Sequence, residues 1–185
     1  MSNLTDFFPS GGGGLTPKFE EFNASGTFTP TQALIDAGGY IELFLVGAGG
    51  AGNSSNNGGA GGEVILKKMY LTNTNSITVT IGSGVYQNSG GSSSFLGSSA
   101  GGIDITSLGG TVGGDQSNKM GSGFGSSGGY DGGGSAGSGV LGYGVGGYAA
   151  GRGNPGVTIG KANSGQGSRS AQSGGSGYCL IKWYE

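Results

Sequence analysis

Histidine is absent from this chain of 185 residues, and cysteine occurs once, at Cys179. A single cysteine cannot form a disulfide within the chain or supply a thiolate zinc site. Without histidine there is also no imidazole for a catalytic triad or a proton relay. Cys179 lies in the apolar segment YCLIKWY near the end of the sequence. We expect its side chain to be a small buried hydrophobe of a last strand rather than a reactive thiol.

Charged residues are also scarce, at 10% of the chain, and their formal net charge is -2. This composition offers no basic face that could follow a phosphate backbone, so nucleic acid is not an expected partner. No apolar run approaches the roughly 20 residues of a membrane span, and the first residues lack the basic and apolar regions of a secretory signal. We therefore expect neither a spanning segment nor such a signal.

The acidic residues are too thinly spread to indicate a catalytic pair. Asp104, Asp115 and Asp131 each lie in a separate low-complexity context. A glycosidase acting on surface polysaccharide would need two carboxylates that meet across a sugar ring, and the spacing gives no sign of such a pair. We predict that the protein is not an enzyme and that it holds no cofactor or metal.

Glycine, in contrast, is abundant, with 49 residues, most of them between the apolar segments Tyr40 to Val46 and Tyr178 to Tyr184. Ordering a glycine costs roughly 0.5–1 kcal/mol more than ordering an alanine, so a folded region of this kind needs compensation. Extended helices with three residues per turn can lie very close together when their side chains are hydrogen atoms, and their amides and carbonyls can then bond to neighbours. The composition therefore predicts polyglycine-II-type helices.

Two other interpretations of the glycine-rich field, about residues 106–177, fit less well. Collagen needs glycine at every third position with abundant proline, but here the spacing is irregular and there are only four prolines. A flexible linker would lead to a terminus or another domain, whereas this field returns to the strand-like segment 178–184. We therefore expect both of its ends to be held in a folded domain.

The remaining pattern predicts an all-β protein with no long helix. The sequence alternates apolar and polar residues, or runs apolar, in several short segments bounded by glycine and polar turn residues. We expect a small antiparallel, sandwich-like scaffold that carries the glycine-rich helices and loops, with a turn near Asp36 to Gly39. The expected strands lie within 19–31, 40–46, 63–71, 76–81, 92–96, 103–105 and 178–184.

Residues 47–52, GAGGAG, match the G-x-G-x-x-G pattern of dinucleotide-binding proteins and follow an apolar strand. The pattern requires a helix to begin there, but Asn53 to Gly59 is rich in helix-breaking residues. Lys67 and Lys68 stand about 20 residues further on, where the motif has an acid. We do not expect nucleotide binding.

The first residues, MSNLTDFFPSGGGGLTP, combine an apolar tip with breakers and a run of glycines. We interpret residues 1–18 as an N-terminal arm that docks through Leu4, Phe7 and Phe8, and residues 19–185 as the domain that it tethers.

The order of the pieces LFLVGAGGAG, GGAGGEVILKKMYL, ITVTIGSG, GGSSSFLG and GGSGYCLIKWYE resembles the glycine-rich domain of bacteriophage tail fibre and adhesin proteins. The likeness covers about Gly39 to Glu185. It implies a homotrimeric virion component of the tail, assembled in the bacterial cytoplasm, which contacts other tail or baseplate proteins. It further implies non-covalent attachment to a glycan or an outer-membrane protein of the host. The alternative is a purely structural baseplate or capsid decoration protein that touches no receptor.

In such a protein the residues that vary would lie in loops at the ends of a rigid scaffold, where binding residues are usually found. Aromatic rings would stack on sugar faces, and an arginine would bind an anionic group. The other possible role of these rings is to cover the glycine-rich helices or to pack between subunits. The candidate receptor-binding residues are Phe124, Tyr130, Tyr143, Tyr148 and Arg152, with Tyr86 from an earlier loop.

Overall fold

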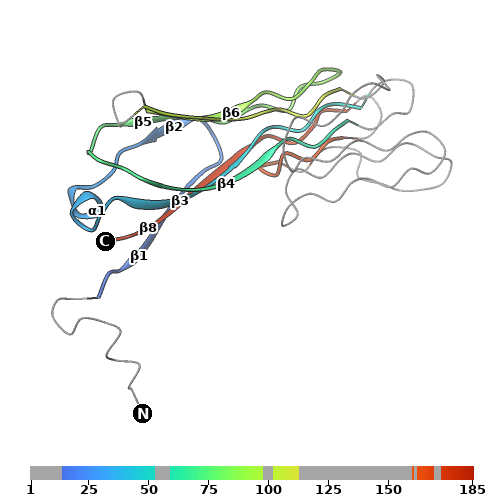
Figure 1. Cartoon of the computed structure of the whole chain (residues 1–185). Coiled ribbons are helices and arrows are strands. Elements are labelled where there is room, and N and C mark those ends of the chain that lie inside the picture. Colours follow the sequence, from blue (N-terminus) through green and yellow to red (C-terminus); the bar gives the residue numbers. More distant parts are fainter. Residues whose placement is uncertain (1–13, 53–58, 98–101, 113–159, 161, 169–171) are drawn as a thin grey trace, which may run out of the picture.

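The computed structural model describes residues 14–52, 59–97, 102–112, 160, 162–168 and 172–185 (Figure 1). These residues form eight strands and one short helix. In chain order the elements are β1 (Pro17–Phe22), β2 (Gly26–Phe28), α1 (Gln32–Asp36), β3 (Tyr40–Val46), β4 (Val64–Tyr70), β5 (Ile77–Thr80), β6 (Ser93–Gly97), β7 (Ile103–Ser107) and β8 (Tyr178–Tyr184).

The strands form two four-stranded antiparallel sheets. The first sheet has the order β1-β8-β3-β4 and the second has the order β2-β5-β6-β7. β3 lies between β8 and β4, as its nearly continuous apolar sequence predicts for an inner strand. β8 pairs with both β1 and β3, so the closing strand expected at 178–184 is confirmed and is held on both sides.

The core lies between the two sheets. Both sheets contribute the side chains of alternate residues along their strands to this core. Phe28 from the second sheet meets Trp183 from the first, with their ring centroids 5.5 Å apart. Leu43 and Ile181, paired on neighbouring strands, are buried, and so is Cys179, as expected. The all-β fold with two antiparallel sheets and almost no helix is therefore confirmed for the described residues.

The glycine-rich segments continue the strands beyond the sheets, with the same register. Val46 pairs with Tyr178 at the end of β3 and β8, and the Gly49 amide then donates to the Gly175 carbonyl at 2.8 Å. Three other strand pairings, β3 with β4, β5 with β6 and β6 with β7, are extended in the same way by main-chain hydrogen bonds. These bonds join Gly47 to Glu63 and Gly50 to Ala60 beyond β3 and β4, Gly91 to Ser83 beyond β6 and β5, and Gly90 to Gly110 beyond β6 and β7.

Beyond the sheets, main-chain bonds also link the continuations of the two layers. Packed sheets are normally about 10 Å apart because side chains fill the space between them. Here the Ala48 amide, in the continuation of β3, donates to the Gly91 carbonyl in the continuation of β6 at 3.0 Å. The Glu63 amide likewise donates to the Leu108 carbonyl, beyond β7, at 2.9 Å. We call this set of bonded segments the glycine lattice: residues 47–52, 59–63, 82–84, 88–91, 108–111, 164–168 and 173–177.

One helical turn, α1, was not expected from the sequence, which predicted only a turn near Asp36 to Gly39. Thr31 caps the helix, because its hydroxyl oxygen accepts a hydrogen bond from the Leu34 amide at 3.0 Å. The side chain of Leu34 is fully buried and anchors the turn on the core. Gly38 and Gly39 have positive φ angles, which end the helix and direct the chain into β3. The expected turn is therefore the C-terminal end of this helix.

The N-terminal part of the chain is described from Gly14 onward. β1 begins at Pro17, so the last residues assigned to the arm are already in the first sheet. β1 and β2 belong to different sheets, and the predicted strand region 19–31 therefore crosses from one layer to the other. The expected docking residues Leu4, Phe7 and Phe8 lie outside the described residues, as does most of the glycine-rich field.

Candidate functional site

The glycine motif 47–52 is an extended segment whose amides are all engaged within the protein. The amides of 47 to 51 donate to main-chain carbonyls, and the Gly52 amide donates to the Ser168 hydroxyl at 2.9 Å. The segment is buried and carries no helix. A dinucleotide site needs free amides at a helix N-terminus to hold the pyrophosphate. These contacts oppose nucleotide binding here, in line with the expectation from the sequence.

The direction of donation along this segment repeats every three residues. In a strand, successive residues alternate between two neighbours, whereas here each amide points to the next of three neighbouring segments. Two of the three pairs of residues three apart donate to the same segment, and the third pair donates to two segments that are bonded to each other through the Gly175 amide and the Gln166 carbonyl. Gly47 and Gly50 donate to the segment 60–63, Ala48 and Ala51 to 88–91, and Gly49 and Gly52 to the adjoining segments 173–177 and 164–168.

Glu63 and Ser107 join the glycine lattice to the sheets. The Glu63 carboxylate accepts a hydrogen bond from the Leu108 amide at 2.9 Å, and its side chain is largely buried. The Ser107 hydroxyl donates to the Glu63 carbonyl at 2.6 Å and accepts from the Gly47 amide at 2.8 Å. These two side chains bond main-chain groups from three separate segments, so they stabilise the transition from pleated sheet to glycine lattice.

Tyr86 is the one candidate receptor-binding residue that the structure describes. It lies in the loop between β5 and β6, and its side chain is 54% exposed. In Figure 1 this loop is the yellow-green one, at the end of the segments that continue β5 and β6. Tyr86 lies at the tip of this loop. Before the tip, Gly84 packs against the Gly174 carbonyl, and after it the Asn88 carbonyl accepts a hydrogen bond from the Ala51 amide at 2.9 Å. The exposed ring therefore stands on a loop fixed at both ends by the glycine lattice.

The neighbours of Tyr86 give the tip a mixed surface. Val85 is 39% exposed, and Gln87 has a positive φ angle of 54° that reverses the chain. The Asn88 side-chain amide donates to the Tyr86 carbonyl at 3.2 Å and closes the turn. Phe124, Tyr130, Tyr143, Tyr148 and Arg152 lie outside the described residues.

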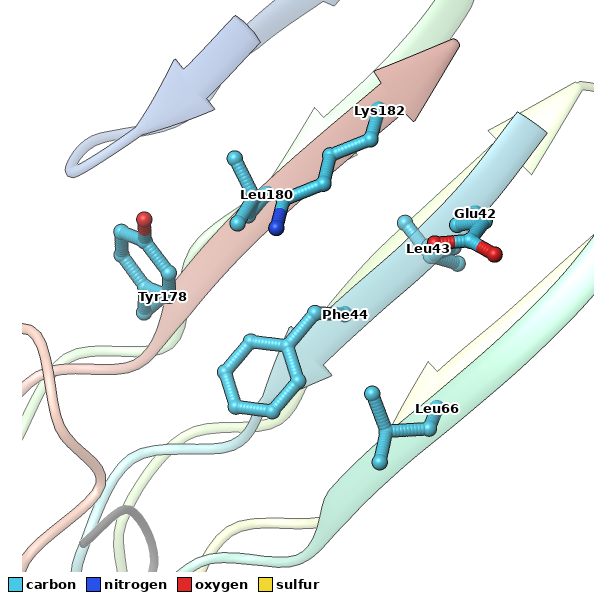
Figure 2. A pocket seen from close by; sticks show the side chains of 7 residues that line it. All are labelled: Glu42, Leu43, Phe44, Leu66, Tyr178, Leu180 and Lys182. Atoms are coloured by element: carbon cyan, nitrogen blue, oxygen red, sulfur yellow. The ribbon is translucent and has the colours of Figure 1, made fainter. Parts of the chain in front are cut away.

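A second candidate surface, missed at the sequence level, is the face of the first sheet that points away from the second sheet, here called the outer face. A hollow of about 180 Å³ lies on this face. Figure 2 shows the side chains that line it, with Phe44 between Leu66 on one side and Tyr178 and Leu180 on the other, and Glu42 and Lys182 toward one end. The Phe44 and Tyr178 rings meet edge to face at 6.1 Å between centroids. The period-two pattern of β8 contained the signal, since Tyr178, Leu180 and Tyr184 alternate with the core residues of that strand.

A second hollow of about 260 Å³ continues along the outer face past Glu42 and Lys182 and reaches Phe19 and Tyr184. The two hollows share Glu42 and Lys182, which face each other in register on β3 and β8. Glu42 forms an exposed ion pair with Lys68 at 3.3 Å. Lys182 has no ion-pair partner among the described residues.

The described residues offer little to chemistry at a reactive centre. Burial, and then the nearby Glu20 carboxylate, raise the pKa of the Cys179 thiol to about 12, which keeps it protonated near neutral pH. No group of three His, Cys, Asp or Glu side chains in the described residues is placed to bind a metal. Asp104 lies exposed on β7, while Asp115 and Asp131 are outside the described residues.

The described part of the chain has no helix of the length and apolar character that crossing a bilayer requires. No protein-family model matches the sequence, and no curated protein matches it.

Proposed function

We propose that this protein is a bacteriophage tail fibre or fibre-like protein that attaches to the bacterial surface by non-covalent binding. The resemblance of its ordered strand and glycine motifs to tail fibre glycine-rich domains motivates this proposal. The observation that supports it best is the exposed Tyr86 on a loop whose two ends are bonded to the glycine lattice. A loop held in place before binding loses little conformational entropy when it meets its ligand.

The glycine lattice is, in this proposal, a bundle of polyglycine-II-type helices. The support is the three-residue repeat in the direction of donation along 47–51, where Gly47 and Gly50 share one neighbouring segment and Ala48 and Ala51 share another, which matches the three residues per turn of that helix. Hydrogen exchange followed by NMR tests it residue by residue. We expect the buried, bonded amides of Gly47 to Ala51 to exchange far more slowly than the exposed Gly14 amide. Fast exchange throughout 47–51 would rule out the bundle as a rigid element.

In this function the chain supplies positioning and contact rather than chemistry. The sheets hold the lattice, the lattice fixes the loop ends, and aromatic side chains at those ends stack on a glycan or pack on an outer-membrane protein. Host glycan or outer-membrane protein on one side, and other tail or baseplate proteins on the other, are the partners that we propose. The N-terminal residues Leu4, Phe7 and Phe8 are proposed to dock the chain to the virion.

Binding of the purified, fluorescently labelled chain to a panel of whole bacterial cells tests the attachment role. We expect binding to some strains, and at least a several-fold loss in the variant Tyr86→Ala. The control is Leu96→Ala, which trims an exposed apolar side chain on β6 and should bind like the original chain. If the chain binds no strain and does not block phage adsorption, the attachment role is wrong and a purely structural virion role becomes the better proposal.

A further inference from the structure

The outer face of the first sheet exposes an unusual amount of apolar and aromatic surface. Large apolar or aromatic side chains that point outward from three of its four strands, β1, β4 and β8, are at least half exposed: Phe19 at 68%, Leu66 at 60%, Tyr70 at 70% and Tyr184 at 52%. Contiguous apolar surface of this kind usually marks an interaction site. The two hollows that meet at Glu42 and Lys182 lie on the same face.

We propose that this outer face binds the same face of a second copy of the chain, related by a two-fold axis that runs parallel to the strands between β3 and β8. Such an axis places each residue of β3 opposite the β8 residue that it pairs with in its own sheet. Glu42 of one copy then meets Lys182 of the other, and the partly exposed Leu180 lies opposite Phe44, whose ring is largely covered within its own copy. The inference rests on this face alone, and it departs from the trimer that the resemblance to tail fibre proteins implies.

The charges of the face favour its own copy over a charged partner. Its outward-facing charged residues are two acidic and two basic: Glu21, Glu42, Lys68 and Lys182. A balanced face does not repel its copy, and it offers no excess of either sign to an anionic or cationic surface. The two-fold axis also gives Lys182 the carboxylate partner that the described residues of its own copy do not provide.

The size of the face comes close to the lower limit for a small specific interface. Four strands about 4.8 Å apart and up to seven residues long, at about 3.4 Å per residue, span roughly 19 by 24 Å. Two such faces present roughly 900 Å² in projection, and more as accessible surface because side chains stand out from them. Specific interfaces begin at about 1,200 Å² of total buried surface.

Sedimentation equilibrium of the full chain over a wide concentration range tests the proposal through charge reversal. We expect the original chain to form dimers, and Glu42→Lys or Lys182→Glu alone to weaken them at least tenfold, because like charges then face each other. A mixture of the two single variants should form a heterodimer, since one copy then carries only lysine at positions 42 and 182 and the other only glutamate. The double variant, with the charges exchanged, should dimerise again.

The control is Lys67→Glu. Lys67 is exposed and lies next to Lys68 on β4, but on the opposite side of the strand from the outer face, so reversing its charge should leave the dimer unchanged. Thermal unfolding of each variant shows whether it is folded. A monomer at all concentrations would overturn the proposal, and if deleting residues 1–13 then produced a dimer, the chain's own arm would be the occupant of the face. A trimer, the state that the resemblance implies, would also overturn it, because an isologous contact joins copies in pairs.

Discussion

The Gly49 amide donates a hydrogen bond to the Gly175 carbonyl at 2.8 Å, in the register that β3 and β8 set three residues earlier through Val46 and Tyr178. The alignment of the glycine segments is therefore set by the strands that they continue. Apolar strands fix the register because a shift of one residue would turn their core side chains outward. The glycines then carry that register beyond the sheets, where two layers approach closely enough to bond through their main chains.

Gly50 is a position where any side chain would push two segments apart. Its amide donates to the Ala60 carbonyl at 2.9 Å, and a Cβ there would overlap the Thr111 carbonyl oxygen. We expect Gly50→Ala to destabilise the protein by about 1–3 kcal/mol, which lowers the melting temperature by roughly 2–12 °C for a domain of this size. Gly14→Ala is the control, because a Cβ at Gly14 meets nothing within 4 Å. Equal melting temperatures for the two variants would contradict close packing at Gly50.

Variants of Glu63 test whether its side chain stabilises the junction between the sheets and the glycine lattice. Replacing it by alanine leaves the Leu108 amide without its acceptor, at a cost of about 1–3 kcal/mol. Glu63→Gln keeps a side-chain oxygen that can accept the same bond, so we expect it to lose clearly less stability than Glu63→Ala. Urea denaturation of the two variants measures the difference. If the two variants unfold at the same urea concentration, the side-chain hydrogen bond to the Leu108 amide contributes nothing to the stability of the junction.

Much of the fold follows from the sequence, because apolar alternation is a strong signal in strands such as Ser76 to Ile81 and Tyr178 to Tyr184. The single turn of α1 was missed, since five residues are too few to show helical periodicity and its stability comes from the Thr31 cap and the buried Leu34. Glycine sequences contain no register information, so the bonding partners of 47–52 could not be predicted. Tyr86 could be selected as an exposed aromatic in a loop, but its anchoring by Gly84 and Asn88 could not.

The outer face was also missed, for a different physical reason. An inner strand such as β3 is apolar on both faces, so its sequence does not say which apolar side chains enter the core. Only the pairing of β3 with β8 shows that Phe44 and Leu180 share the face opposite to Leu43 and Ile181. The local pattern of β8 marks one strand of this surface, and the tertiary arrangement is needed to define the rest.

Cys179 should make stability fall as the solution becomes alkaline. In the unfolded chain its thiol loses a proton near pH 9, whereas burial and the Glu20 carboxylate raise its pKa to about 12 in the folded state. Between these values the folded state holds one more proton than the unfolded state, so rising pH favours unfolding, by up to about 1.4 kcal/mol per pH unit from this one group. Below pH 9 the thiol is protonated in both states, and its contribution does not change with pH.

The measurement is the free energy of unfolding of the original chain and of Cys179→Ala between pH 7 and pH 11. Tyrosine and lysine titrate in both proteins, so only the difference between them reports the thiol. We expect that difference to be constant up to about pH 9 and then to change in favour of the variant. Labelling by iodoacetamide at pH 8 provides a second readout, because a buried, protonated thiol reacts only after unfolding. Rapid labelling of the folded protein, or parallel pH profiles up to pH 11, would show that Cys179 is accessible and ionises as an ordinary thiol.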